Sequence, residues 1–311
     1  MLKIGGGILT CVILCEALLR VKWGFCDTVL MRASDKYEYI ALPNQNRMRF
    51  GNHISYNSLS MRSPEVKKGS IKILGLGDSV INGGVLTDQD SLATTILSNR
   101  LSDALSQDVE VLNISAGSWG PDNCNAYLDE NGCFDAIAML LVVSSHDAHD
   151  NMDFKPIVGI SPSFPEKQYS LAIVELFDRY LLPRIENIIK KKTRQQQLAD
   201  FEKEEGIKKT GKGFNAGFLA LKHKADSLHI PMIIYLHAEQ SELKNKQYNS
   251  QGDEIINFAR LNNITIVKDL DSDLTTDWYR KGDNIHLSQY GQSRMAELIY
   301  PYLLKYCAKR E

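Results

Sequence analysis

A serine in the first third of the chain and a histidine near its end have surroundings that suit nucleophilic catalysis. Ser79 follows Asp78 and the run Ile71-Lys-Ile-Leu-Gly-Leu-Gly77, in which an apolar segment breaks at glycine and gives way to polar side chains. Asp283 and His286 lie three residues apart in a polar turn. A carboxylate can fix the tautomer of an imidazole, which can then accept the proton of a serine hydroxyl. We therefore predict that Ser79 is a nucleophile, His286 its base and Asp283 the acid that orients the base.

The glycines before Ser79 do not match nucleotide-binding motifs. Gly75-Leu-Gly77 is not followed by glycine at position 80, as the dinucleotide fingerprint requires, and no Gly-Lys-Ser/Thr of a P-loop is present. Residue 81 is isoleucine, so the Gly-x-Ser-x-Gly turn of the α/β-hydrolases is also missing. The sequence therefore excludes nucleotide binding and that class of hydrolase.

Apolar segments alternate with helical patterns from Ile71 onwards. Strands are predicted at 71–76, 109–114, 136–143, 231–236 and 264–267. Helices are predicted at 91–105, at 171–191 with a bend near Pro183, at 216–228, before 261 and after 288; the second of these closes the unit of the third strand. Repeated β-then-α units with apolar strands predict an α/β protein, with three α/β/α layers and a mainly parallel central sheet. Polar residues after the strands then share the edge at which open α/β sheets bind ligands.

The N-terminal segment, residues 1–24, has the features of an export signal. Its apolar run is interrupted at Glu16, and the uninterrupted part has 12 residues, fewer than the ~20 that a spanning helix needs. No small-x-small cleavage site follows. An uncleaved signal anchor is therefore favoured over a cleaved signal peptide and over a buried N-terminal helix. The first two predict an extracytoplasmic protein, attached to the membrane through this segment or exported.

The rest of the chain divides into an arm and a domain. Residues 25–68 are polar and rich in turn-forming residues, which predicts an extended arm that packs on the catalytic body or acts as a spacer. Residues 69–308 form the predicted catalytic domain. Within it, residues 190–213 are strongly polar and are predicted to be a solvated insertion or a flap over the site.

Charge and cysteine content define no partner. With 36 basic and 38 acidic residues the net charge is −2, so no nucleic acid is expected to bind. Cys124 and Cys133 flank the turn-forming pair Asn131-Gly132, and both a local disulfide and two free thiols remain open. No cofactor is predicted.

The cluster His146-Asp147-Ala-His149-Asp150 offers ligand types that suit zinc or manganese. It follows a strand rather than lying within a helix, however, and a serine–histidine–aspartate triad needs no metal. We therefore predict no metal site. His237 and Glu239, at the end of the fourth strand, are predicted to have structural roles or to line the pocket.

Four segments of the chain resemble, in the same order, the four sequence blocks of the SGNH (GDSL-type) hydrolases. They are Gly77-Asp-Ser-Val80, residues 113–123, Ser144-Ser-His-Asp147 and Asp283-x-x-His286. The resemblance covers roughly residues 71–304, and the run Asn57-Ser-Leu-Ser-Met-Arg-Ser-Pro64 is similar to the arm of anchored bacterial members. It implies the flavodoxin-like SGNH hydrolase fold and the same triad.

The resemblance also implies an oxyanion hole made of the Ser79 backbone N–H, a glycine of the second block and an asparagine of the third. By register Ser118 occupies the glycine position, with Gly117 adjacent, and His146 occupies the asparagine position. An imidazole N–H can donate to an oxyanion as a carboxamide does, whereas complete loss of one donor costs ~10²–10³ in rate.

The expected function is that of a serine esterase acting through an acyl-enzyme on a small ester or an acylated glycan, above all O-acetyl groups of an extracytoplasmic glycan. Two alternatives are an O-acyltransferase, which discharges the acyl group onto a sugar hydroxyl, and a catalytically weak glycan-binding module, which the replacement of asparagine by His146 suggests. The sequence leaves the oligomeric state open.

Overall fold

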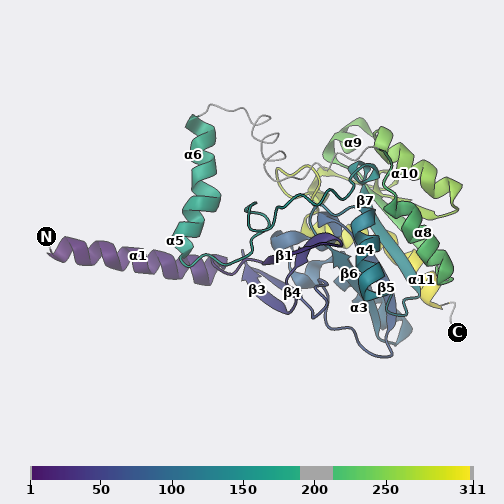
Figure 1. Ribbon diagram of the computed structural model, residues 1–311, viewed down its shortest axis with the longest axis horizontal. Coiled ribbons are helices and arrows are strands. Elements are labelled where there is room, and N and C mark those ends of the chain that lie inside the picture. The colour runs from purple at the N-terminus through teal and green to yellow at the C-terminus, as the bar shows by residue number, and fades with distance from the viewer. Residues whose placement is uncertain (1, 190–212, 309–311) are drawn as a thin grey trace.

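A five-stranded parallel sheet forms the centre of the described part of the chain (Figure 1), which in this computed structural model comprises residues 2–189 and 213–308. Its strands are β5 (Ile71–Gly77), β6 (Val109–Ser115), β7 (Ala138–Ser144), β8 (Met232–His237) and β9 (Thr265–Lys268). They lie in the order β6-β5-β7-β8-β9 and every neighbouring pair is parallel. The chain places β6 on one side of β5 and then crosses over to form β7 on the other side, so the topological switch point lies between β5 and β7.

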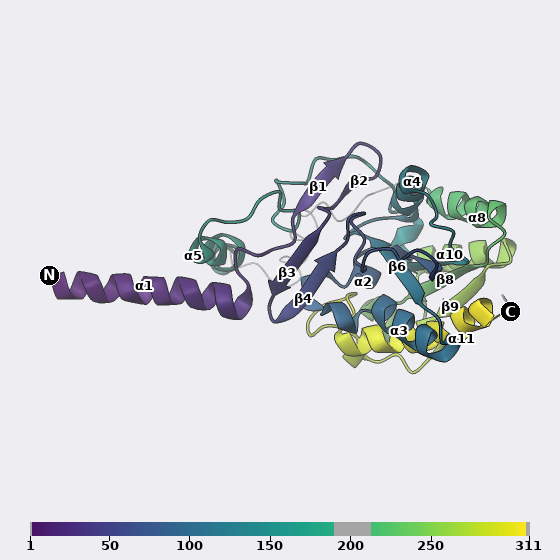
Figure 2. The ribbon, with the colours of Figure 1, turned by 90° about the horizontal axis from the view of Figure 1, so that it is seen from below.

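Helices cover both faces of the sheet, which confirms the predicted three-layer α/β/α architecture. In Figure 2, α3 (Ala93–Leu105) and α11 (Gln289–Ala308) pack together on one face, and α4 (Pro121–Asn131) and α8 (Gly217–Ser227) on the other. α10 (Ser250–Leu261) packs beside α8, where the ring centroids of Phe218 and Phe258 are 5.5 Å apart. Every side chain of β7 is buried, as expected for a central strand with helices on both sides.

The predicted arm consists of two antiparallel hairpins that pack on the sheet domain. The first joins β1 (Met31–Ser34) to β2 (Glu38–Ala41), and the second joins β3 (Gln45–Arg49) to β4 (Asn52–Tyr56). Tyr39, Ile40, Ile54 and Met61 belong to the same hydrophobic core as the central sheet. The arm and the sheet domain therefore share one hydrophobic core.

α1 (Leu2–Trp23) extends away from the body (Figure 1). Its acidic residue, Glu16, accepts hydrogen bonds from the backbone N–H groups of Ala172 and Ile173 at 2.8 and 3.0 Å and forms an ion pair with Arg20. Glu16 therefore caps a second helical segment that starts at Ala172. Across residues 2–189 and 213–308, no helix combines the length and apolar character needed to cross a membrane.

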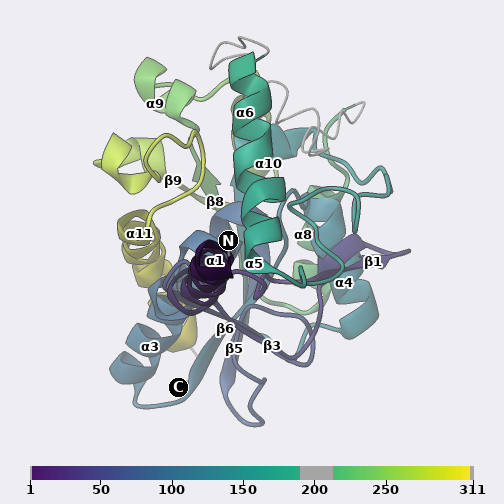
Figure 3. The same cartoon turned by 90° about the vertical axis from the view of Figure 1, so that its left-hand side faces the viewer.

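That second segment, which we call the α5–α6 rod, comprises α5 (Ala172–Glu175), a π-helical turn (Leu176–Leu181) and α6 (Leu182–Ile189). A helix was predicted here, but its predicted role in closing the β7 unit on the sheet is wrong. The rod contacts α1 at α5 and leads away from it (Figure 3), and α8 makes the crossover instead. Pro183 has no N–H to donate, which accounts for the widened turn before it.

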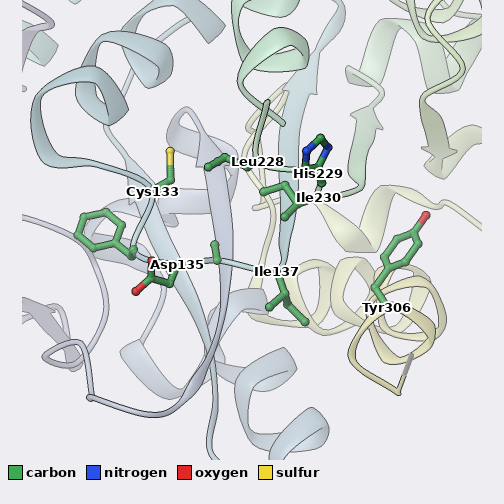
Figure 4. Close-up of a pocket in the computed structure, with 9 residues that line it drawn as sticks. Cys133, Asp135, Ile137, Leu228, His229, Ile230 and Tyr306 are labelled. Carbon is green, nitrogen blue, oxygen red and sulfur yellow. The ribbon is translucent and has the colours of Figure 1, made fainter. Parts of the chain in front are cut away.

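The cysteine pair forms no disulfide, a surface hollow lies away from Ser79, and the predicted polar insertion is mostly outside the described residues. Cys124 and Cys133 are free thiols, and Cys124 points its sulfur at the carbonyl of Gly77, 3.9 Å away. A surface hollow bordered by Cys133, Ile137 and His229 lies at the amino-terminal edge of the sheet (Figure 4). This edge is opposite to the one that carries Ser79. The predicted insertion, residues 190–213, falls almost entirely outside the described residues.

Candidate functional site

Ser79 lies at the carboxyl end of β5, next to the switch point of the sheet. Gly77 permits the close approach of β5 to β7: its φ is +155°, and a Cβ there would lie 2.5 Å from the carbonyl oxygen of Val142. Asp78 then accepts a hydrogen bond from Val80 N–H at 2.8 Å and caps the short helix α2 (Ser79–Asn82). Ser79 is consequently the first residue of that helix and is partly exposed.

The structure brings Ser79, His286 and Asp283 together in the predicted order. The Oγ of Ser79 lies 2.9 Å from Nε2 of His286, and Nδ1 of His286 lies 2.9 Å from Oδ2 of Asp283. Ser79 and His286 are 207 positions apart in the chain. One ring nitrogen thus faces a hydroxyl and the other a carboxylate, which is the geometry needed for the imidazole to take the serine proton.

Asp283 is held as a carboxylate by its surroundings. Its second oxygen, Oδ1, accepts hydrogen bonds from the backbone N–H groups of Ile285 and His286, both at 2.9 Å. Burial alone would raise the pKa of Asp283, but these hydrogen bonds and the one from the imidazole outweigh burial and hold the pKa well below its usual range. The carboxylate can therefore orient His286 across the whole neutral pH range.

Two arginines, the fully buried Arg62 and the partly buried Arg280, fix the elements that carry Ser79 and His286. The sequence analysis did not identify either of them. Arg62, from the arm, donates to the carbonyl oxygens of Asn82 at 2.5 Å and Thr87 at 2.6 Å, and also to that of Gly84. Arg280 precedes Asp283 and donates to Gly83 O at 2.5 Å. The end of α2 is thus tied both to the arm and to the turn that contains His286.

The turn after β6 contains the predicted oxyanion residues Gly117 and Ser118. Ser118 has a φ of +57°, a left-handed conformation that glycine adopts more easily than serine. The backbone shape expected of a glycine is therefore kept with serine in place. The hydroxyl of Tyr39, from β2, donates to the carbonyl oxygens of Gly117 at 2.9 Å and Ser118 at 3.2 Å, so the arm also fixes this turn.

His146 lies on a short 3₁₀ helix (Ser145–Ala148) that follows β7. Its Nδ1 is 3.3 Å from Glu239 and its Nε2 is 3.8 Å from Asp147. Burial alone would lower the pKa of His146, but the carboxylates of Asp147, Glu239 and Asp78 outweigh burial and raise it to about 10. Within the described residues no hydrogen bond joins His146 to Ser79, so its role as an oxyanion donor stays a prediction.

The remaining histidines of the strand ends have other partners. His149 is turned towards α10, where its Nε2 lies 2.9 Å from Glu254, so it does not share a ligand set with His146. Asp78, His146 and Asp147 do bring potential ligand atoms within 4.8 Å of one another. Burial raises the pKa of Asp147 well above its usual range, which disfavours the charged carboxylate that a metal ion would require. His237 is fully buried against Asp269 and does not line an open pocket.

Known proteins similar to this chain were found only among solved structures. No protein-family model and no curated protein matches it. The crystal structure of TesA is 13% identical, with 76% of this chain and 99% of that chain covered and a TM-score of 0.43. The Clostridium thermocellum family 3 carbohydrate esterase is 13% identical, with 77% and 99% covered and a TM-score of 0.42. A two-domain esterase (CEX) active on acetylated mannans is 11% identical, with 76% and 50% covered and a TM-score of 0.43. At these identities and TM-scores we infer function from the site itself.

Proposed function

We propose that the protein is a serine esterase in which Ser79, His286 and Asp283 form the catalytic triad. The proposal rests on one observation, the unbroken series of contacts from the Ser79 hydroxyl through His286 to Asp283, each 2.9 Å long. A histidine that merely capped a helix or lay on the surface would not need a hydroxyl at one nitrogen and a carboxylate, itself saturated with backbone N–H donors, at the other. The same contacts weigh against a glycan-binding module that lacks catalysis.

In the acylation half of the reaction, Nε2 of His286 takes the proton of Ser79 as Oγ attacks the carbonyl carbon of an ester. Asp283 stabilises the imidazolium that forms. The negative charge develops on the carbonyl oxygen, which the Ser79 backbone N–H stabilises together with the predicted donors of the turn that contains Gly117 and Ser118. His286 then passes its proton to the departing alkoxide, so an alcohol leaves and the acyl group remains bonded to Ser79.

In the deacylation half, a water molecule replaces the alcohol. His286 takes a proton from the water as its oxygen attacks the acyl carbon. When the second tetrahedral intermediate collapses, the proton returns to Oγ of Ser79 and a carboxylic acid is released. His286 therefore acts as a base and then as an acid in each half, and no external oxidant or cofactor enters the balance.

A fluorophosphonate probe tests the proposal directly, because it labels only an activated serine. We expect the wild-type protein to label and to hydrolyse p-nitrophenyl acetate, and the Ser79→Ala variant to do neither. Folded wild-type protein that does not label would refute the proposal. The His146→Asn and His146→Ala variants then test the oxyanion hole: wild-type rates for both would exclude His146 from it.

We propose O-acetyl groups on an extracytoplasmic glycan as the substrate, supported by the export signal expected of residues 1–24. We expect acetate to be released from acetylated glycan faster than a fatty acid is released from a long-chain acyl ester. Transfer to a sugar hydroxyl would instead appear as acetylation of an added glycan that outpaces hydrolysis. The two outcomes separate an esterase from an O-acyltransferase.

We further propose that α1 and the α5–α6 rod attach the protein to a membrane surface. More than half of the large apolar side chains that are exposed in the described ranges lie on these two elements, among them Ile8, Val12 and Ile13 on α1 and Phe177 and Ile185 on the rod. The exposed residues of α1 are spread around the whole helix, which suits a lipid environment better than a single protein partner. Glu16 is meanwhile paired with Arg20.

Flotation of the full-length protein with phosphatidylcholine–phosphatidylglycerol vesicles tests membrane attachment. We expect the wild-type protein to float and the double variant Val12→Asp, Ile13→Asp to remain in the dense fraction. The matched control places the same charges at Leu219 and Leu261, which are exposed apolar residues of the body, and should float. Wild-type protein that stays in the dense fraction would exclude attachment.

A further inference from the structure

A second aspartate–histidine pair lies buried behind the turn that carries Asp283 and His286, residues 280–288, which we call the catalytic turn. His237 is the last residue of β8, and its Nδ1 lies 2.6 Å from Oδ2 of Asp269, the residue that follows β9. Both side chains are completely inaccessible to solvent. Since β8 and β9 are parallel, the pair lies at the same edge of the sheet as Ser79.

The other nitrogen of His237 reaches the catalytic turn. Its Nε2 lies 2.8 Å from the carbonyl oxygen of Ile285, the residue immediately before His286. A carbonyl oxygen can only accept, so Nε2 must carry a proton. Asp269 already accepts hydrogen bonds from Ala238 N–H at 3.0 Å and from the Tyr235 hydroxyl at 3.3 Å, so it too faces His237 as an acceptor.

Both nitrogens of His237 therefore face acceptors, and a neutral imidazole can satisfy only one of them. The imidazolium satisfies both and neutralises the buried carboxylate. Burial alone would lower the pKa of His237, but the charge and hydrogen bond of Asp269 outweigh burial and raise it. The ring of Tyr279, which is itself buried, packs against the imidazole with the two ring centroids 5.4 Å apart.

We propose that His237 is a positioning residue for ester hydrolysis: held by Asp269, it donates to Ile285 and so fixes the placement of His286 relative to Ser79. This inference rests on the proposed esterase function. Both polar groups of the peptide bond between Ile285 and His286 are hydrogen-bonded. The N–H of His286 donates to Asp283, and the carbonyl oxygen of Ile285 accepts from His237.

The catalytic turn needs such support because its key side chains are not themselves buried. The side chains of His286 and Asp283 are 33% and 27% exposed, so packing alone does not fix them. On the β8 side, the backbone N–H of Gln240 donates to Asn284 O at 2.9 Å, and His237 supplies the next contact along. Release of Ile285 would let the base drift from the serine, and a displacement of ~1 Å is enough to cost on the order of 10² in rate.

Two substitutions at position 237 separate the contacts. In His237→Gln the amide nitrogen takes the place of Nε2 and can still donate to Ile285 O. In His237→Asn it takes the place of Nδ1, so it can reach Asp269 but not Ile285. Both variants remove the positive charge and keep a polar side chain, so they form a matched pair that differs in which of the two contacts is kept, the one to Ile285 or the one to Asp269.

The control is His229→Asn, at the amino-terminal end of β8 beside the hollow in Figure 4. His229 is exposed and has a φ of +55°, a conformation that asparagine tolerates. Its kcat and KM for p-nitrophenyl acetate should equal those of the wild type. Active sites in every preparation are first counted by fluorophosphonate titration, so that rates refer to folded, competent enzyme.

We expect His237→Gln to keep kcat within about 10-fold of the wild type and His237→Asn to lose on the order of 10² in kcat with little change in KM, because the contact acts on the reacting groups rather than on substrate binding. Equal kcat values for the two variants, or a loss explained wholly by fewer titratable sites, would overturn the inference. Wild-type protein that cannot be titrated would overturn the esterase proposal and this inference with it.

Discussion

Replacement of Arg62 by methionine should destabilise the protein and impair catalysis at once, although Arg62 lies outside the predicted catalytic domain. Its side chain is completely buried, and its guanidinium donates to the carbonyl oxygens of Asn82, Gly84 and Thr87. Methionine keeps an unbranched apolar stem of similar length but supplies no donor. The substitution therefore removes the hydrogen bonds with little change in packing.

The magnitude follows from the number of acceptors left without a partner. Each buried polar group that loses its hydrogen bond costs about 1–3 kcal/mol, so three carbonyls give roughly 3–9 kcal/mol. Part of this is offset, because burial of the guanidinium is itself unfavourable, as the lowering of the pKa of Arg62 to about 10 by burial shows. We therefore expect the lower end, about 3 kcal/mol, which corresponds to a fall of about 6–12 °C in Tm for a domain of this size.

Differential scanning calorimetry of the Arg62→Met variant measures the fall in Tm, and active-site titration followed by ester hydrolysis measures kcat. Arg32→Met, an exposed arginine of the same arm, is the matched control and should melt with the wild type. Because Asn82 ends the helix that begins at Ser79, we also expect kcat per titrated site to fall. A variant that melts within ~1 °C of the wild type would show that water or a shifted backbone satisfies the carbonyls, and would refute the reasoning.

Three further outcomes follow from the site. The hydrogen bonds that lower the pKa of Asp283 stabilise the folded protein at pH values above about 4, the ordinary pKa of a carboxyl group. The difference in Tm between the wild type and Asp283→Asn should therefore shrink as the pH falls below about 4. A difference in Tm that stays constant with pH would contradict this prediction. The raised pKa of His146, about 10, means that its contribution is complete below about pH 6.5 and is lost as the pH rises towards 10. Urea unfolding of His146→Asn should therefore differ from the wild type most below pH ~6.5. Gly77→Ala should lose about 1–3 kcal/mol in the same assay because of the contact with Val142, whereas Gly6→Ala, where a Cβ meets nothing within 4 Å, should not.

The contacts among Ser79, His286 and Asp283 could be predicted from the sequence because their signals are local and their geometry is set by the sheet. An apolar strand that ends in Gly77 and Ser79 delivers the serine to the carboxyl edge, and parallel pairing brings every other strand end to that edge. Asp283 and His286 are close enough in sequence to pair within one turn. Neither inference required knowledge of side-chain packing.

Other features could not be predicted because their partners are far apart in the chain. His237 looks the same in sequence whether it meets Asp269 and Ile285 or only solvent. A helix was predicted over residues 171–191, and the described residues Ala172–Ile189 are helical, yet the sequence alone does not say whether the apolar face of such a helix meets a sheet. Here Phe177 and Ile185 remain exposed, because Glu16 of α1 caps the helix at Ala172 and directs it away from the body.

The arm shows most clearly where a boundary drawn in sequence differs from one drawn in structure. Position 69 is where strand–helix alternation begins, but Arg62 holds the helix of the serine, and Tyr39 holds the turn that contains Gly117. In each contact a side chain of the arm donates a hydrogen bond to a backbone carbonyl oxygen of the domain. Because every residue type has such a carbonyl, these contacts fix the main chain of the domain but leave no recognisable motif in its sequence. Ser79 and the predicted oxyanion turn are therefore both positioned from outside residues 69–308, so the arm supports the candidate site rather than acting as a spacer that leads to it.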